Sequence, residues 1–207
     1  ILLYKSLIEY SRVLAIGFDY GQRNKSELDA AITICKDFGV EYRILDATFI
    51  KQLSKDCYLL NQTDVMENRN FIVPFRNGFF LEMAMSIAAN ENYDYVLLGG
   101  LLEEIGVIDK NPVYLKKLQR VFNEGAGLDK KIEIKMPFVD LYITRYKTFK
   151  LAEQYGILEY LDKHVVSCYD GAVGLFGCKT CYHCKRRKLG YEIYLLKKER
   201  DAMKTKE

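Results

Sequence analysis

Hydrophobic residues follow two patterns along this chain: short continuous apolar runs, and longer stretches with helical spacing. The short runs, bounded by turn residues, predict buried strands at 12–21, 40–47, 93–100 and 131–138. The longer stretches predict helices at 26–38, 77–90, 112–125 and 147–155. Segment 51–70 fits neither pattern and is expected to be a mobile surface loop. Strands and helices that alternate in this way indicate an α/β protein, with a doubly wound, mostly parallel sheet covered by helices on both faces.

One polar segment follows the first predicted strand. Ligands of parallel α/β sheets bind at the carboxyl ends of the strands, and "FDYGQRN" occupies such a position. It places five polar side chains just beyond a buried run: Asp19, Tyr20, Gln22, Arg23 and Asn24. This composition indicates a binding loop, and a plain Asp-Tyr-Gly turn is the alternative. Ser26 is expected to cap the helix that follows.

A second polar segment, "VPFRNG", puts Arg76 and Asn77 at the expected start of a helix. Amides at a helix N-terminus favour anions, and a guanidinium can add a bidentate contact to phosphate or carboxylate. The segment therefore indicates an anion site. The alternative is a helix cap by Asn77 beside a surface arginine.

Four of the six cysteines gather near the end of the sequence, at Cys168, Cys178, Cys181 and Cys184. The last three form two overlapping C-x-x-C units, in which two thiolates can reach one ion at about 2.3 Å. Four sulfurs without an open position describe a closed, tetrahedral structural zinc site. A redox C-x-x-C, an iron–sulfur cluster and scattered core cysteines are the alternatives. Cys35 and Cys57 are interpreted as ordinary core or surface residues.

The basic run Lys185–Lys188 follows the last cysteine directly. It is either a solvated helix face that balances the charge of the metal site or a patch that binds phosphate or nucleic acid. His183 lies between two of the cysteines and could replace one as a ligand. Four sulfurs make that replacement unnecessary.

The composition is that of an ordinary soluble globular protein, with 49% hydrophobic and 29% charged residues. No apolar run reaches the roughly 18 residues that span a bilayer, and no signal peptide is visible. A net charge of +3 is too small to indicate nucleic-acid binding by itself. We therefore expect a cytoplasmic protein in a reducing compartment, where clustered thiols bind metal or catalyse rather than form disulfides.

Several segments, taken in chain order, resemble the 7-cyano-7-deazaguanine synthase (QueC) family of the PP-loop ATP pyrophosphatases. They span nearly the whole chain: "FDYGQRN", "FIVPFRNGFFL", Gly99-Gly100 with Glu103, "MPF" at 136–138, and "SCYDG" followed by "GCKTCYHCKRRKLGY". The most specific part is Cys-Tyr-x-Gly followed by G-C-x-x-C-x-x-C. The resemblance implies an adenine nucleotide alpha hydrolase-like fold. It implies a nucleotide-binding PP-loop ATPase domain over 1–160 and a helical zinc-binding region over 161–207.

The resemblance also implies a reaction. ATP is cleaved between its α and β phosphates, and the AMP activates the carboxylate of 7-carboxy-7-deazaguanine. Ammonia displaces the AMP to give an amide, and a second ATP-driven round dehydrates the amide to the nitrile, preQ0. Cations and amide dipoles must surround the pyrophosphate as charge builds there, and Mg²⁺ shares that load. Zinc in this family is structural and lies beside the active site, and homodimers are common.

The resemblance assigns residue roles by position. In the nucleotide and substrate group, Asp19 and Tyr20 would lie beside adenine and ribose, and Gln22 and Arg23 at the nucleotide pocket or a subunit contact. Arg76 and Asn77 would serve the phosphate or the substrate. Gly99 and Gly100, with Glu103, would lie where the nucleotide approaches the backbone. The zinc ligands are Cys168, Cys178, Cys181 and Cys184.

The family's S-G-G-x-D-S phosphate loop has no counterpart in this sequence, so no catalytic residue is assigned. By family order it would fall between Leu3 and Tyr4, where Ile1–Leu3 is expected to end a strand. Either a flexible loop is omitted at that point, or the chain is a degenerate, non-catalytic relative. An intact mass of 24.1 kDa would exclude the omission.

Other departures from the family concern the substrate. Phe75 stands where the family has glycine, only Pro112 survives of a Tyr-Pro-Asp-Cys-Arg stretch, and 145–147 reverses one charge of a Lys-x-Glu. Such changes predict altered recognition of the base, because unpaired buried groups are costly. A divergent ligase or amide-former of an antiviral operon, with a protein or nucleic-acid acceptor, is therefore the first alternative to the synthase. A non-catalytic zinc-ribbon module that binds nucleic acid is the second.

Overall fold

The computed structural model describes residues 1–54, 57, 59–60 and 73–204 and confirms an α/β protein with parallel strands. The chain forms two compact units. One comprises Ile1, the described part of 3–71, and 145–204; the other comprises Leu2 and the described part of 72–144. Neither boundary coincides with residue 160, so the functional division at that position stays a prediction. Most of the loop predicted over 51–70 lies outside the described residues.

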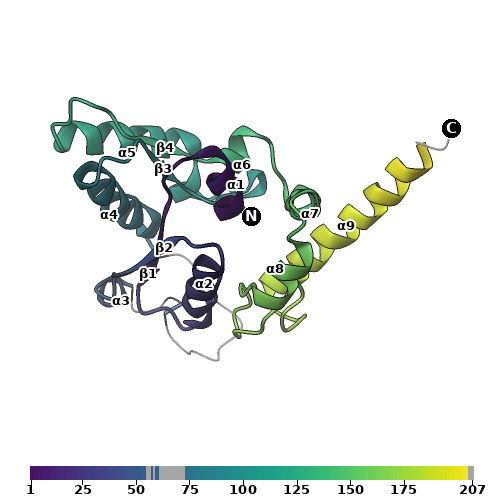
Figure 1. The fold of residues 1–207 in the computed structure, drawn as a ribbon. Helices are drawn as coiled ribbons and strands as arrows, with labels where there is room; N and C mark the ends of the chain where they lie inside the picture. The colour runs from purple at the N-terminus through teal and green to yellow at the C-terminus, as the bar shows by residue number, and fades with distance from the viewer. Residues whose placement is uncertain (55–56, 58, 61–72, 205–207) are drawn as a thin grey trace. The chain divides into compact units, whose positions relative to one another are not determined.

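The first unit opens with α1 (Leu2–Glu9), followed by β1 (Leu14–Asp19), α2 (Ser26–Asp37), β2 (Glu41–Asp46) and α3 (Ile50–Leu53) (Figure 1). Strands β1 and β2 pair in parallel, from Leu14 opposite Glu41 to Asp19 opposite Asp46. The expected strand end at Ile1–Leu3 is wrong, because Leu2 and Leu3 belong to α1 and the Lys5 amide donates to the Ile1 carbonyl at 3.0 Å.

Helix α2 begins at Ser26, as predicted, but Ser26 does not cap it. Ser26 is the first helical residue, and its amide donates to Oδ1 of Asn24 at 3.0 Å. Asn24 therefore satisfies one of the amides that a helix start leaves without an intrahelical partner. Glu27 and Asp29 in the first turn are favourable for the helix dipole. Gly39, at φ +66°, ends the segment in the left-handed conformation.

The same unit closes with α7 (Arg145–Gln154), α8 (Leu158–His164) and α9 (Tyr182–Lys204). Helices α7 and α9 pack against each other, and Phe149, Leu175 and Tyr194 form their buried cluster. Burying large side chains of this kind stabilises the unit by about 1.5–3 kcal/mol each. This cluster attaches the cysteine-bearing segment to the rest of the unit.

The second unit contains α4 (Arg76–Asn90), β3 (Tyr95–Leu97), the 3₁₀ turns η2 (Leu102–Glu104) and η3 (Ile108–Lys110), α5 (Pro112–Gly125), β4 (Glu133–Lys135) and α6 (Pro137–Asp140). Strands β3 and β4 pair in parallel. Leu81, Leu115 and Met136 are the buried centre of its core. Helix α5 has the predicted bounds: Asn111 accepts a hydrogen bond from the Val113 amide, and Pro112 occupies the first turn.

All four predicted strands and all four predicted helices are present among the described residues, with bounds that differ by a few positions. Each unit holds one parallel pair of strands within the described residues. A single doubly wound sheet stays a prediction. Within the described residues, no helix is long and apolar enough to cross a membrane.

Candidate functional site

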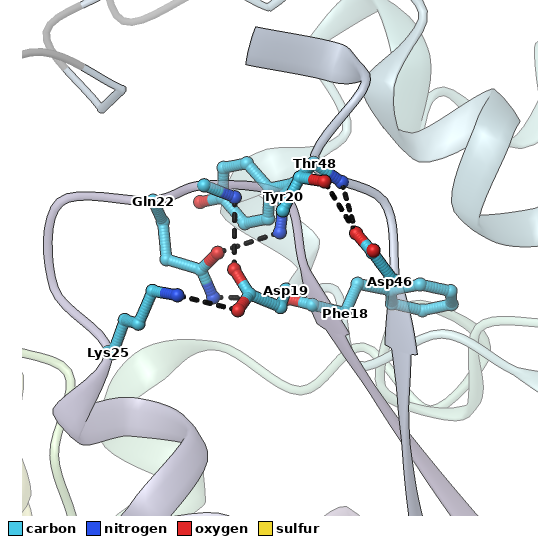
Figure 2. A network of polar contacts seen from close by, with 8 residues as sticks. Phe18, Asp19, Tyr20, Gln22, Lys25, Asp46 and Thr48 are labelled. Atoms are coloured by element: carbon cyan, nitrogen blue, oxygen red, sulfur yellow. Dashed lines mark hydrogen bonds and ion pairs between the residues drawn. The ribbon is translucent and has the colours of Figure 1, made fainter.

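The segment 18–25 forms a tight polar loop at the carboxyl end of β1 (Figure 2). Asp19, the last strand residue, accepts a hydrogen bond from the Gly21 amide at 3.1 Å and pairs with Lys25 Nζ at 2.6 Å. The Lys25 contact is the main reason that the pKa of Asp19 lies below its ordinary value. Gly21 adopts φ +73°, where glycine is favoured. The Asp19 carboxylate is thus ionised and fixed at the strand end.

Gln22 shapes this loop from within. It is 5% exposed, its Nε2 donates to the Phe18 carbonyl at 3.0 Å, and its Oε1 accepts from the Tyr20 amide at 2.8 Å. Both ends of its amide are therefore bound to the loop's own backbone. A direct nucleotide contact by Gln22 stays a prediction.

A second carboxylate lies opposite Asp19 in the strand register. Asp46, the last residue of β2, accepts hydrogen bonds from the amide and hydroxyl of Thr48 at 2.8 and 2.6 Å, as Figure 2 shows. The Thr48 contacts hold the pKa of Asp46 below its ordinary value. Two ionised carboxylates thus stand at the carboxyl ends of neighbouring parallel strands.

The four predicted ligand cysteines come together in the first unit. Their sulfurs all lie within 4.8 Å of one another. Cys168 and Cys184 are buried, whereas Cys178 and Cys181 are half-buried. Four cysteine sulfurs at this separation form the donor set of a tetrahedral structural zinc site. The residues present fit that ion, and as a structural cross-link it would leave no position for substrate.

Backbone and hydroxyl donors point at these sulfurs. The Cys178 sulfur accepts from the Thr180 hydroxyl and the Cys181 amide, both at 3.3 Å, and the Cys168 sulfur accepts from the Asp170 amide at 3.4 Å. The Thr180 hydroxyl and the amides lower the pKa of Cys178 to about 6. Burial raises the pKa of the Cys184 thiol to about 12. The Cys178 thiol therefore ionises readily, whereas the buried Cys184 thiol needs a bound cation to ionise.

Gly177 is required by the packing of this cluster. It has φ +47°, and a Cβ there would lie 2.6 Å from Sγ of Cys184 and 3.0 Å from Cβ of Cys168. Gly171 and Gly174, in the same loop, also have positive φ, so three glycines give this loop its path around the cysteines.

The side chains around the cysteines bear on the two interpretations of the basic run. His183 is outside the four-sulfur cluster, and its ring meets that of Tyr169 edge-on at 4.6 Å. Arg187 is 7% exposed and donates to the Gly174 carbonyl at 2.8 Å. Arg186 bonds to the Tyr182 hydroxyl, and Lys188 pairs with Glu192 at 3.7 Å. One of the four cations is therefore buried beside the cysteines, which favours the role of charge balance.

In the second unit, Arg76 and Asn77 begin α4, as predicted. Asn77 is 6% exposed, and its backbone N–H donates to Oδ2 of Asp109 at 3.3 Å. Its side-chain Nδ2 has no hydrogen-bond partner within the described residues. Phe75 precedes the helix at φ +60° and is 69% exposed. A non-glycine residue in this conformation costs roughly 1–2 kcal/mol, at the position where the family pattern has glycine.

The remaining predicted residues also lie in the second unit. Gly99 and Gly100 follow β3, and Gly100 is buried against Met136, whose Cε would lie 2.2 Å from an added Cβ. Glu103 is exposed on η2. The structure thus collects Asp19, Tyr20, Gln22, Arg23 and the cysteines in one unit, and Arg76, Asn77, Gly99, Gly100 and Glu103 in the other.

Sequence reasoning missed the tertiary contacts that three residues make. Asn24 had no assigned role, although it joins the loop after β1 to the cysteine loop by donating to the Cys168 carbonyl at 2.7 Å. Lys25 pairs with Asp19, and Arg187 is buried near the cysteines. The i, i+3 spacing of Cys184 and Arg187 on a helix was the available signal for the last of these.

The family model for "Queuosine biosynthesis protein QueC" matches residues 1–195. This chain belongs to the QueC family. Among curated relatives, a 7-cyano-7-deazaguanine synthase of Clostridium botulinum strain Langeland is 31% identical over 200 residues, which cover 91% of this chain and 88% of the relative. A 7-cyano-7-deazaguanine synthase of Lysinibacillus sphaericus is 29% identical over 192 residues, covering 90% and 85%. The QueC match therefore includes the β1 loop, the start of α4 and the four cysteines together.

Proposed function

We propose that this chain is an ATP-dependent 7-cyano-7-deazaguanine synthase. Its substrates are 7-carboxy-7-deazaguanine, ammonia and ATP, and its carbon–nitrogen bond forms when ammonia displaces AMP from an adenylate. The QueC match over residues 1–195 carries the proposal, because it spans both polar segments and the cysteine cluster. Relatives named for this activity at about 30% identity support it.

The chain's own residues support a nucleotide at the carboxyl end of β1. Asp19 is ionised and fixed there, and Tyr20 stands next to it on a loop that Gln22 braces. Binding at this edge is the rule for parallel α/β sheets. Mg²⁺, brought with the triphosphate, would share the charge that develops on pyrophosphate. Zinc held by the four cysteines would supply a structural cross-link for the adjoining loop.

Asn77 supports a ligand at the start of α4. A buried amide donor without a protein partner costs roughly 1–3 kcal/mol, and Nδ2 of Asn77 is such a donor within the described residues. An acceptor oxygen from phosphate, carboxylate or the base would remove that cost. We therefore assign Asn77 to the ligand rather than to helix capping.

Product analysis tests the proposal. Protein of verified intact mass is incubated with Mg-ATP, ammonium and 7-carboxy-7-deazaguanine, and products are identified by mass spectrometry. Nitrile with two AMP per turnover is expected. Asn77→Asp, which replaces the donor by an acceptor, should lower turnover at least 10-fold, whereas Asn90→Asp on the far end of α4 should not. Absence of AMP from protein that carries the phosphate loop would refute the proposal.

A divergent amide-former or ligase is the second candidate, and the start of α4 favours it. Phe75 replaces the family's glycine in a left-handed conformation. Tyr114, from the stretch that departs from the family, places its hydroxyl 2.9 Å from where a Cβ on Gly78 would be. Phe75 lies two residues before Asn77, and Tyr114 lies against Gly78, the residue after it. Amide as the final product would identify an amide-former that uses ammonia, whereas a stalled adenylate would identify a ligase that requires a protein or nucleic-acid acceptor.

Self-association is part of the proposal, and α9 supports it. Tyr182, Leu189, Leu196 and Met203 are exposed by 56, 57, 67 and 65% and recur every seven residues. The buried residues of α9, including Arg187 and Tyr194, lie on the opposite side of the helix. Apolar side chains aligned along one exposed face of a helix are a feature of protein–protein contact surfaces. We therefore propose a homodimer that pairs this stripe with its copy.

A further inference from the structure

Asn24 joins the β1 loop (residues 20–25) to the cysteine loop (residues 165–181) that carries Cys168. Nδ2 of Asn24 donates to the carbonyl of Cys168 at 2.7 Å, and Oδ1 of the same side chain accepts from the Ser26 amide at 3.0 Å. The first bond crosses to a segment 144 positions away, and the second fixes the start of α2. Asn24 thus holds two elements with both ends of one rigid, planar group.

The two loops approach closely around this bond. A Cβ added to Gly171, which has φ +74°, would lie 2.9 Å from Oγ of Ser26 and 3.2 Å from Oδ1 of Asn24. Arg23 and Asp170 add an ion pair at 3.5 Å. Both of these charged side chains are substantially exposed, so their pair contributes little by itself. Asn24 is therefore the main polar connection.

The acceptor of this bond belongs to a ligand residue. The Cys168 carbonyl also accepts from the Gly171 amide at 3.1 Å, and the Cys168 sulfur is buried among the other three. Partners that hydrogen-bond to metal-ligating groups fix their orientation, and removing them typically lowers metal affinity 10–100-fold. The Asn24 bond acts on the ligand residue through its backbone carbonyl. Displacement of Asn24 would therefore displace the backbone of Cys168 and, with it, the buried sulfur of this ligand residue.

We propose that Asn24 is a positioning residue that couples the four-cysteine site to the β1 loop, so that nucleotide binding and zinc retention strengthen each other. The proposal rests on the proposed function, which puts the nucleotide beside Asp19 and Tyr20 on the same loop. Coupling between two binding sites is reciprocal. A nucleotide that orders the loop thus slows zinc release, and loss of the Asn24 bond removes that effect.

Two substitutions separate this role from helix capping. Asn24→Asp keeps the oxygen that accepts from Ser26 and removes the donor to Cys168, whereas Asn24→Ala removes both. Asn111→Asp is the matched control, because Asn111 caps α5 in the other unit by accepting from the Val113 amide at 2.9 Å. Zinc transfer to a chromophoric chelator is timed for each protein, and Mg-ATP binding is measured by calorimetry.

We expect Asn24→Asp and Asn24→Ala to release zinc at least about 10-fold faster than wild type, and Asn111→Asp to release it at the wild-type rate. A carboxylate beside a site of four thiolates can speed release through its charge, so equally fast release from the uncharged Asn24→Ala is what assigns the effect to the lost hydrogen bond. Mg-ATP should slow release from wild type and leave release from Asn24→Asp unchanged.

Each contrary result has a distinct meaning. Asn24→Asp that behaves as wild type would overturn the positioning role. Wild-type protein that binds Mg-ATP but releases zinc equally fast with and without it would overturn the coupling and leave the proposed function standing, and this comparison needs no variant. Absence of Mg-ATP binding would overturn the proposed function, and the coupling with it.

Discussion

Replacing Gly177 by alanine should weaken the metal site directly, and Gly156→Ala provides the matched control. Both glycines have positive φ, +47° and +68°, so alanine costs roughly 1–2 kcal/mol of backbone strain at either position. A Cβ at Gly156 meets nothing within 4 Å, whereas at Gly177 it lies 2.6 Å from the Cys184 sulfur. Non-bonded carbons separate by about 3.5–4.0 Å, so the sulfur or the loop must move by about 1 Å.

That displacement exceeds the latitude of about 0.2 Å in metal–ligand distances. We expect Gly156→Ala to lower the melting temperature by roughly 2–4 °C for each kcal/mol of strain and to keep its zinc. Gly177→Ala should lower it further and release zinc to a chelator at least about 10-fold faster. Thermal denaturation and metal analysis measure both effects. Equal melting temperatures and equal zinc release for the two variants would refute the argument that Gly177 is required by the cysteine cluster.

Phe75→Gly should stabilise the protein by about 0.5–1 kcal/mol in urea denaturation, because relief of left-handed strain exceeds the greater chain entropy of glycine; Phe75→Ala should show no such gain. Lys25→Met should raise the pKa of Asp19 toward its ordinary value, as carboxyl NMR titration would measure. Because the folded pKa is the lower one, the stability from this pair is present above about pH 4 and is lost as pH falls through the folded pKa. Leu196→Glu should convert the dimer to a monomer in analytical ultracentrifugation. The melting temperature of this monomer should equal that of wild-type protein diluted to a monomer. Arg187→Met should destabilise zinc-loaded protein by about 3 kcal/mol, because it removes a buried cation beside the thiolates. Denaturation of zinc-loaded and zinc-stripped protein measures the stability that zinc adds. An equal zinc contribution in Arg187→Met and wild type would contradict this role of the charge.

Local patterns in the sequence determined the elements and most of the cysteine cluster. Strand and helix positions follow from apolar periodicity, as at β1 and α5, because burial on one face is a property of consecutive residues. Three of the four clustered cysteines follow from C-x-x-C spacing, because a short turn by itself brings two sulfurs together, whereas Cys168 joins them from ten residues upstream. Family motifs added the predicted roles of the residues between them, which stay predictions.

Contacts between distant segments were decided only by the tertiary structure. Nothing near Asn24 in the sequence indicates a bond to Cys168, and nothing near Arg187 indicates burial against Gly174. The sequence also misplaced the cap of α2 on Ser26, which is the first helical residue. Asn24, two positions earlier, has comparable capping chemistry and accepts from the Ser26 amide. Spacing along the chain specifies which groups can act locally, whereas the packing of loops specifies which of them meet, because that depends on the path of the whole backbone.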